Sequence, residues 1–138
     1  MSLWQIYYHL VWTTKNRQPL ITSNKEAQLY DYILGKADAL NCKVHAIDGI
    51  EDHIHLVVTI PPNLAISEFV KRIKGSSSHH LNHSPNTLSE KFAWQEGYGV
   101  FSLGYKQLQD VVAYVQNQKS HHSQLTTHPY LEPQNAKE

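Results

Sequence analysis

Apolar positions recur along the chain with two different periods, and the change from one period to the other predicts the order of the elements. Runs of β-branched and aromatic residues with a period of two predict strands, and apolar residues three and four positions apart predict helices. The predicted strands cover Ile6–Trp12, Lys43–Ile47, His53–Ile60 and part of Phe92–Leu103. The predicted helices run from Ser23 to about Leu40, from Asn63 or Ser67 to Gly75, and from about Gln107 to Ser120.

Local signals sharpen these boundaries. Ser23 and Glu26 have the spacing of a capping box, in which the hydroxyl and the carboxylate bind free backbone N–H groups at a helix start. The polar stretch 76–89 predicts the end of the second helix and a loop. The apolar face of the first helix is expected to carry Tyr30, Ile33, Leu34 and Ala37.

The order β-α-β-β-α-β with one more helix predicts an α+β, ferredoxin-like fold: one antiparallel sheet with two helices on one face. The chain has 138 residues, of which 41% are apolar and 17% charged, which suits one compact domain with its own core. We expect a single domain over residues 1–127 and a polar tail over 128–138. Many functions share this fold, so the site must decide between them.

The composition limits the partners, the cellular compartment and the cofactors that we expect for this protein. The formal net charge is zero, which argues against binding to nucleic acid through a global positive field, although local clusters can still contact phosphate. The single cysteine, Cys42, excludes an internal disulfide, and no apolar stretch has the length of a membrane span. We therefore expect a cytoplasmic protein. The absence of a phosphate-cradling glycine-rich motif predicts no nucleotide cofactor.

The segment around His53 and His55 carries the first candidate chemistry. In a strand, Ile54, Leu56 and Val58 share one face, suited to the core, whereas His53 and His55 project side by side from the other. Two neighbouring imidazoles can chelate one cation, and the spacing does not identify the ion. The alternative is that both histidines are polar residues on the solvated face of a half-exposed strand.

Tyr114 and Gln118 carry the second candidate chemistry. They are four residues apart on the last predicted helix, so they share a face that flanks the apolar stripe. Peripheral core packing of the tyrosine and an ordinary surface position of the glutamine are the alternatives. His79, His80, His121 and His122 are expected at the surface.

Four blocks, in this order, resemble the single-tyrosine HUH transposases of small bacterial insertion sequences, and among them the REP-associated tyrosine transposases. The resemblance covers nearly the whole chain. The blocks are Tyr8 to Arg17, Asp52-His53-Ile54-His55-Leu56-Val57, Trp94-Gln95-Glu96-Gly97-Tyr98-Gly99, and Tyr114 to His122.

The resemblance implies a reaction and a site. Tyr114 would be the nucleophile that cleaves single-stranded DNA and forms a 5′-phosphotyrosine intermediate, and His53, His55 and Gln118 would hold Mg²⁺ or Mn²⁺. The implied substrate is a single-stranded DNA hairpin, and a homodimer is implied as the assembly. Phosphate contacts are expected at Lys15, Arg17, Lys71, Arg72 and Lys74.

Three other functions are consistent with the sequence. A metal-dependent single-strand nuclease would use water in place of Tyr114 as the attacking group. A domesticated hairpin-binding protein would keep DNA recognition without transposition. A ferredoxin-like sensor of small molecules would bind neither DNA nor metal. The hairpin sequence, the physiological metal and the choice between assembly of the site within one chain or across two are not fixed by the sequence.

Overall fold

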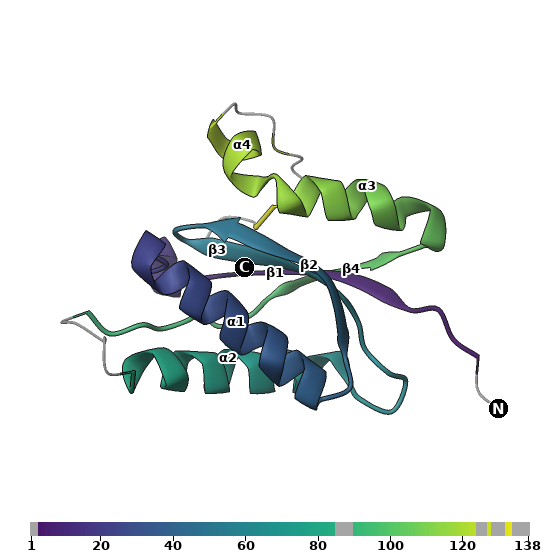
Figure 1. Ribbon diagram of the computed structural model, residues 1–138, viewed down its shortest axis with the longest axis horizontal. Helices are drawn as coiled ribbons and strands as arrows, with labels where there is room; N and C mark the ends of the chain where they lie inside the picture. The colour runs from purple at the N-terminus through teal and green to yellow at the C-terminus, as the bar shows by residue number, and fades with distance from the viewer. Residues whose placement is uncertain (1–2, 85–89, 124–126, 128–131, 134–138) are drawn as a thin grey trace.

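The computed structural model describes residues 3–84, 90–123, 127, 132 and 133, and the predicted α+β fold is confirmed (Figure 1). Most of the predicted polar tail, 128–131 and 134–138, lies outside the described residues. The strands are β1 (Tyr7–Thr13), β2 (Lys43–Ile50), β3 (His53–Thr59) and β4 (Gly99–Leu103). The helices are the 3₁₀ turn η1 (Lys15–Arg17) and α1 (Ser23–Ala39), α2 (Ile66–Asn82), α3 (Tyr105–Gln116) and α4 (Gln118–Ser123).

The sheet has the ferredoxin-like strand order β2-β3-β1-β4, with every neighbouring pair antiparallel. The two central strands, β1 and β3, place Val11 opposite His55 and Thr13 opposite His53. Residues directly opposite each other share a face of the sheet. The face that carries the two histidines is therefore also lined by alternate residues of β1.

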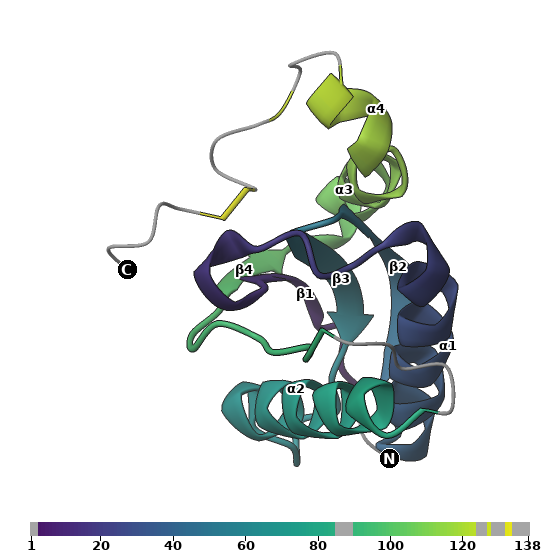
Figure 2. The ribbon, with the colours of Figure 1, turned by 90° about the vertical axis from the view of Figure 1, so that its left-hand side faces the viewer.

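Helices cover both faces of the sheet (Figures 1 and 2). Helices α1 and α2 lie on one side, and α3 with α4 lies on the other. The main core fills the first interface, where Leu10, Leu56 and Phe69 are fully buried. A smaller cluster of Val57, Tyr114 and other residues fills the second. No helix among the described residues is long and apolar enough to cross a membrane.

Helix α2 runs seven residues beyond Gly75, so the prediction that it ends there is wrong. The hydroxyls of Ser76 and Ser77 donate to the backbone carbonyls of Arg72 and Lys74, about one turn back, so both find partners inside the helix. The last turn is also anchored from outside. Leu81 is buried, and the Asn82 side chain hydrogen bonds both the N–H and the C=O of Phe92.

The predicted capping box of α1 is also wrong. The N-cap is Thr22, which makes no side-chain capping bond, and Ser23 is already the first helical residue. The Glu26 carboxylate pairs with Lys119 of α4 at 2.8 Å. The buried face of α1 comprises Leu29, Ile33 and Ala37, whereas Leu34, expected on that face, is 40% exposed.

The β2–β3 hairpin turns over only two residues, Glu51 and Asp52, because β2 extends to Ile50 instead of ending at Ile47. Gly49 makes the close approach of the strands possible. A Cβ at this position would overlap the carbonyl oxygen of His53 and lie 2.8 Å from the Cα of Ile54. Gly49 therefore allows β2 to pack closely against the start of β3, where His53 lies.

Candidate active site

Strand β3 delivers His53 and His55 to the face beneath α3 and α4, and both side chains are fully buried. Their ring centroids lie 5.1 Å apart with an interplanar angle of 72°. The alternative of two polar residues on a solvated strand face is therefore wrong. The sequence pattern assigned the face correctly, but the last helices cover it.

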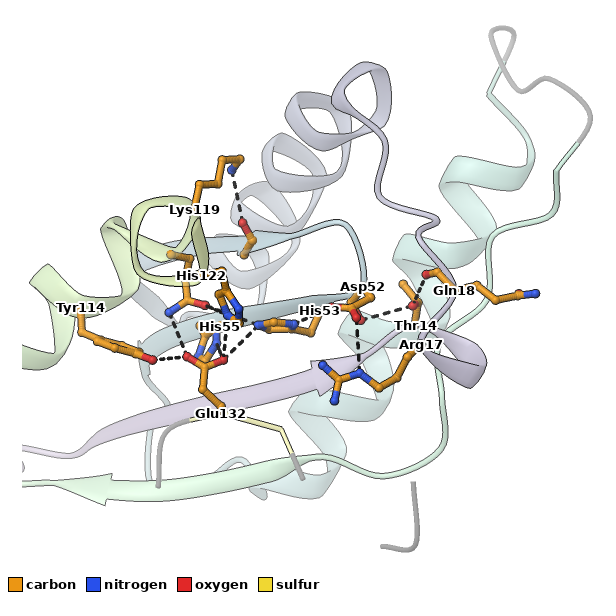
Figure 3. Close-up of polar contacts among 12 residues, drawn as sticks. Thr14, Arg17, Gln18, Asp52, His53, His55, Tyr114, Lys119, His122 and Glu132 are labelled. Atoms are coloured by element: carbon orange, nitrogen blue, oxygen red, sulfur yellow. Dashed lines mark hydrogen bonds and ion pairs between the residues drawn. The ribbon is translucent and has the colours of Figure 1, made fainter. Parts of the chain in front are cut away.

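Each imidazole is held through its Nδ1 atom. His53 Nδ1 lies 2.7 Å from Asp52 Oδ1, and His55 Nδ1 lies 2.8 Å from Nε2 of His9, a residue of β1. Arg17 in turn contacts the other oxygen of Asp52 at 3.4 Å. Both Nε2 atoms consequently point into the same space (Figure 3). A second partner on the far nitrogen is the usual way in which proteins orient a metal-binding histidine.

Tyr114 and Gln118 approach this space from above, but from two helices. The predicted single helix to Ser120 is wrong, because α3 ends at Gln116 and Asn117 adopts φ −114° and ψ 29°. The Asn117 side chain donates to the carbonyl of Ala113 at 2.7 Å, which caps the open end. The Tyr114 ring lies 6.2 Å from that of His55, and Gln118 Oε1 lies 3.4 Å from His53 Nε2.

The structure thus brings together the four residues that were singled out from the sequence: Tyr114, His53, His55 and Gln118. All four come from one chain. Tyr114 is 6% exposed, and the other three are fully buried. The tyrosine and the histidine pair that meet here therefore belong to the same chain.

Glu132, a residue of the predicted tail, lies at the centre of the cluster and was missed by the sequence analysis (Figure 3). Its Oε1 atom lies 3.2 Å from His53 Nε2 and 3.1 Å from His55 Nε2. Its Oε2 atom accepts hydrogen bonds from the Tyr114 hydroxyl and from Gln118 Nε2, the latter at 3.3 Å. No motif or spacing marked this glutamate, which stands between Leu131 and Pro133.

His122 also joins the site, contrary to its expected place at the surface. Its Nε2 atom lies 3.1 Å from both Gln118 Oε1 and Glu132 Oε1, and its side chain is 26% exposed. The spacing of four from Gln118 on a helix was an available signal. His121 stacks on the Tyr114 ring at 4.5 Å. His80 stacks on Tyr32, away from the site.

Burial and hydrogen bonding move the pKa values in opposite directions across the cluster. Burial alone would lower the pKa of His53, but hydrogen bonds to Asp52 and Glu132 raise it overall. For His55, burial prevails and lowers the pKa. Burial, with His55 beside it, lowers the pKa of His9 to about 3. Burial opposes ionisation of Glu132, yet hydrogen bonds from His53 and His55 lower its pKa well below the usual range.

The donor set fits a divalent cation. One ligand atom from each of His53, His122 and Glu132 lies within 4.8 Å of the others, and Gln118 Oε1 lies 3.1 to 3.4 Å from the Nε2 atoms of the two histidines. Neighbouring donors around an octahedral cation with bonds of about 2.1 Å are about 3.0 Å apart. Mixed nitrogen and oxygen donors, with a carboxylate among them, suit ions such as Mn²⁺.

The five residues expected to contact phosphate lie outside this cluster. Lys15 and Lys71 are exposed. Arg72 pairs with Glu68 at 2.8 Å, and the Lys74 ammonium donates to the backbone carbonyls of Gln95 and Gly97. Arg17 contacts the carboxylate that orients His53.

Comparison with known proteins places the chain in a class. The family model described as "Transposase IS200 like" matches residues 2–118, so the chain is a member of the transposases, enzymes that process DNA. More narrowly, it belongs to the IS200-like transposase family.

Individual proteins that are similar to this chain agree with the family assignment. The ISDra2 transposase TnpA of Deinococcus radiodurans is 26% identical over 84% of this chain and 86% of its own length. The IS200 transposase of Salmonella typhimurium is 27% identical over 83% of this chain and 78% of its own.

Two solved structures share the fold. A Deinococcus radiodurans protein described as a candidate transposase superposes with a TM-score of 0.64 at 25% identity, covering 85% of this chain and 93% of the other. A REP-associated tyrosine transposase bound to a REP hairpin superposes with a TM-score of 0.67 at 16% identity, covering 88% and 74%. At 16% identity the second likeness supports the fold alone.

Proposed function

We propose that this transposase cleaves and rejoins single-stranded DNA at hairpin-marked ends through a phosphotyrosine intermediate formed on Tyr114. One observation supports this above the others. The Tyr114 hydroxyl lies in a cluster with two oriented imidazoles, an amide and a carboxylate. A tyrosine that only packed in the core would need no such surroundings.

In the proposed reaction, the Tyr114 oxygen attacks the phosphorus atom while the bond from phosphorus to the 3′ oxygen breaks. The products are a 5′-phosphotyrosine link and a free 3′-OH. A phenol, with an ordinary pKa near 10, must give up its proton during the attack. Glu132 Oε2, which already accepts the Tyr114 hydrogen bond, receives that proton and passes it to solvent, and the departing 3′ oxygen takes up one proton from solvent to become the 3′-OH. The reverse attack by a 3′-OH rejoins the strand without ATP.

His53, His55 and Gln118 are proposed as ligands of Mg²⁺ or Mn²⁺, with His122 and Glu132 placed to contribute further donors. A cation bound there would polarise the phosphoryl oxygen and offset the charge that develops in the transition state. The imidazoles supply it with lone pairs on Nε2, because their Nδ1 atoms already have partners. The covering helices keep most water away from the cluster.

The substrate and the assembly belong to the same proposal. A REP hairpin is what the structural neighbour binds, and we propose a single-stranded hairpin for this chain. Lys15 and Arg17 belong to the turn η1, which starts two residues after Thr13. Thr13 lies opposite His53 in the sheet. Phosphates bound there would lead towards the site. Lys71, Arg72 and Lys74 on α2 are proposed as further contacts, and the homodimer remains a prediction.

The test incubates the protein with hairpin oligonucleotides from its own genomic flanks and Mn²⁺ or Mg²⁺, followed by a denaturing gel. We expect a slowly migrating protein–DNA adduct that is absent in Tyr114→Phe and in EDTA. Tyr105→Phe is the matched control, because Tyr105 stands on the same helix but is 67% exposed. Cleavage that persists in Tyr114→Phe would instead support a water-using nuclease. Binding without cleavage would support a domesticated hairpin binder.

A further inference from the structure

His9 is a buried histidine to which the proposed reaction gives no role. It lies on β1 with its Cα paired to Val57 and Phe101 of the flanking strands, and its side chain is fully buried. The ring stacks on that of His55 at a centroid distance of 5.0 Å and 20° between planes. A leucine or phenylalanine would fill this volume without the cost of burying an imidazole.

The contact between the two rings restricts where their protons lie. His9 Nε2 and His55 Nδ1 are 2.8 Å apart, a distance at which one nitrogen carries the hydrogen and the other accepts it. His9 Nδ1 has no hydrogen-bond partner among the described residues. The proton arrangement of the pair is therefore fixed from the other side, at His55 Nε2.

Two arrangements satisfy this contact. While Glu132 Oε1 accepts from His55 Nε2 at 3.1 Å, that nitrogen carries the proton, and His55 Nδ1 accepts from His9. When His55 Nε2 gives its lone pair to a cation, the proton must lie on Nδ1 and be donated to His9. His9 then carries its own proton on Nδ1. The number of protons on the pair is the same in both arrangements.

We infer that His9 is a positioning residue for metal binding: its Nε2 accepts a hydrogen bond from His55 Nδ1–H and thereby holds the His55 Nε2 lone pair towards the cation. This inference rests on the proposed function, because it assumes that His55 is a ligand. Asp52 does the equivalent for His53, as a fixed acceptor. His9 differs because it can either donate or accept, so the pair suits both the free and the loaded site.

The test measures Mn²⁺ affinity by calorimetry on the DNA-free protein, so it does not depend on strand cleavage. His9→Leu removes the acceptor and keeps much of the volume, and we expect it to weaken Mn²⁺ binding by about ten- to a hundredfold. His9→Gln keeps an amide oxygen that can accept from His55, and we expect its affinity within a few-fold of the wild type. His45→Leu is the matched control, since His45 bonds only Thr59 at the far end of β3 among the described hydrogen bonds.

A spectroscopic readout separates positioning from packing. In ¹⁵N spectra of the imidazoles, addition of Zn²⁺ as a diamagnetic probe is expected to move the His9 proton from Nε2 to Nδ1. Unchanged Mn²⁺ affinity in a folded His9→Leu would overturn the inference, and so would a His9→Gln variant as weak as His9→Leu. If His9→Leu does not fold, His9→Gln and the spectra decide.

The two proposals can fail separately. A wild-type protein that forms the DNA adduct, together with a His9→Leu variant of normal Mn²⁺ affinity, would remove the role of His9 and leave the proposed function intact. In His9→Leu, the adduct should return at higher Mn²⁺ concentration, because Tyr114 and the ligands are unchanged. Failure of excess Mn²⁺ to restore it would also count against a positioning role.

Discussion

Both faces of the central sheet strands β1 and β3 are buried, but by different means. Beneath α1 and α2, Leu10, Ile54 and Leu56 meet hydrocarbon from the helices. Beneath α3 and α4, the buried rings of His9 and His55 meet each other and a carboxylate. Apolar contact is non-directional, whereas every buried nitrogen needs a partner at the right distance and angle. The first face therefore contributes apolar packing, whereas the second combines a smaller apolar cluster with a few polar atoms held in one arrangement.

The largest effect is expected at the tyrosine. Tyr114→Phe removes only a hydroxyl, so we expect loss of the DNA adduct by a factor of about a thousand or more, since the residual rate lacks the nucleophile. The melting temperature should stay close to that of the wild type, because the ring still fills its place. A denaturing gel and a thermal melt measure both. A variant that unfolds would show that Tyr114 belongs to the core.

His55→Ala tests whether the polar face also carries stability. Removal of the ring leaves His9 Nε2 without its partner, whereas Glu132 Oε1 keeps its contacts to His53 and His122. An unpaired buried polar group costs about 1–3 kcal/mol. We expect adduct formation to be abolished and urea unfolding to shift to lower concentration, with the far-ultraviolet circular dichroism retained. A variant with full adduct formation would exclude His55 as a ligand.

Leu56→Ala is the counterpart on the apolar face, one residue along the same strand. Loss of a fully buried leucine side chain costs about 2–5 kcal/mol. Mn²⁺ affinity, measured where the variant is still folded, should be unchanged. Weakened metal binding in the folded variant would mean that the two faces are coupled through β3.

Glu132→Gln keeps the shape of the tail side chain and removes its charge. We expect Mn²⁺ affinity and the rate of adduct formation each to fall by about tenfold. The loss of rate is smaller than the usual range for a general base, because hydrogen bonds from the histidines lower the pKa of this carboxylate and make it a weak base. Calorimetry and single-turnover gels measure the two. Faster adduct formation would show instead that the carboxylate blocks the phosphate position.

The pH dependence of stability should carry the signature of His9. Its pKa is lowered from 6.5 to about 3, so the unfolded state binds the proton first as the pH falls. The contribution of this residue is present in full above pH 6.5 and is lost at up to about 1.4 kcal/mol per pH unit below it. Urea unfolding of metal-free protein at pH 7, 6 and 5 should show a shallower decline in His9→Gln. Equal slopes would contradict the lowered pKa.

The smallest effect is expected at Lys119, which pairs with Glu26 at 2.8 Å and Asp48 at 3.1 Å while 56% exposed. Exposed pairs contribute up to about 1 kcal/mol, so Lys119→Ala should be almost as stable as the wild type. Because the pairs hold α4, we still expect a loss of adduct formation of a few-fold, restored in Lys119→Arg. Activity equal to the wild type would show that Gln118 is held without the pairs.

The sequence predicted the elements that follow a regular period. Alternation in β3 separated Ile54 and Leu56 from His53 and His55, and the order of the strands led to the correct sheet. The spacing between Tyr114 and Gln118 correctly indicated a common destination, although the helix between them breaks. Those signals are local, and local backbone geometry determines them.

What the sequence did not predict depends on contacts between distant parts of the chain. Glu132 meets His55 across 77 positions, and no periodic pattern marks an acid in a polar tail. Helix α2 continues past Gly75, and its last turn is held by the Asn82 side chain, which binds the backbone of Phe92. At the break between α3 and α4, the Asn117 side chain donates to the carbonyl of Ala113. Helix propensity alone does not predict whether an asparagine makes this bond.

The assembly of Tyr114, His53 and Gln118 within one chain has a genetic consequence. A copy without the tyrosine and a copy without the histidine each lack one group of their own site, and we expect that neither copy supplies the missing group to the other. Mixing Tyr114→Phe with His53→Ala protein should therefore yield no complementation. Two different defective alleles in the same cell would then not restore transposase activity.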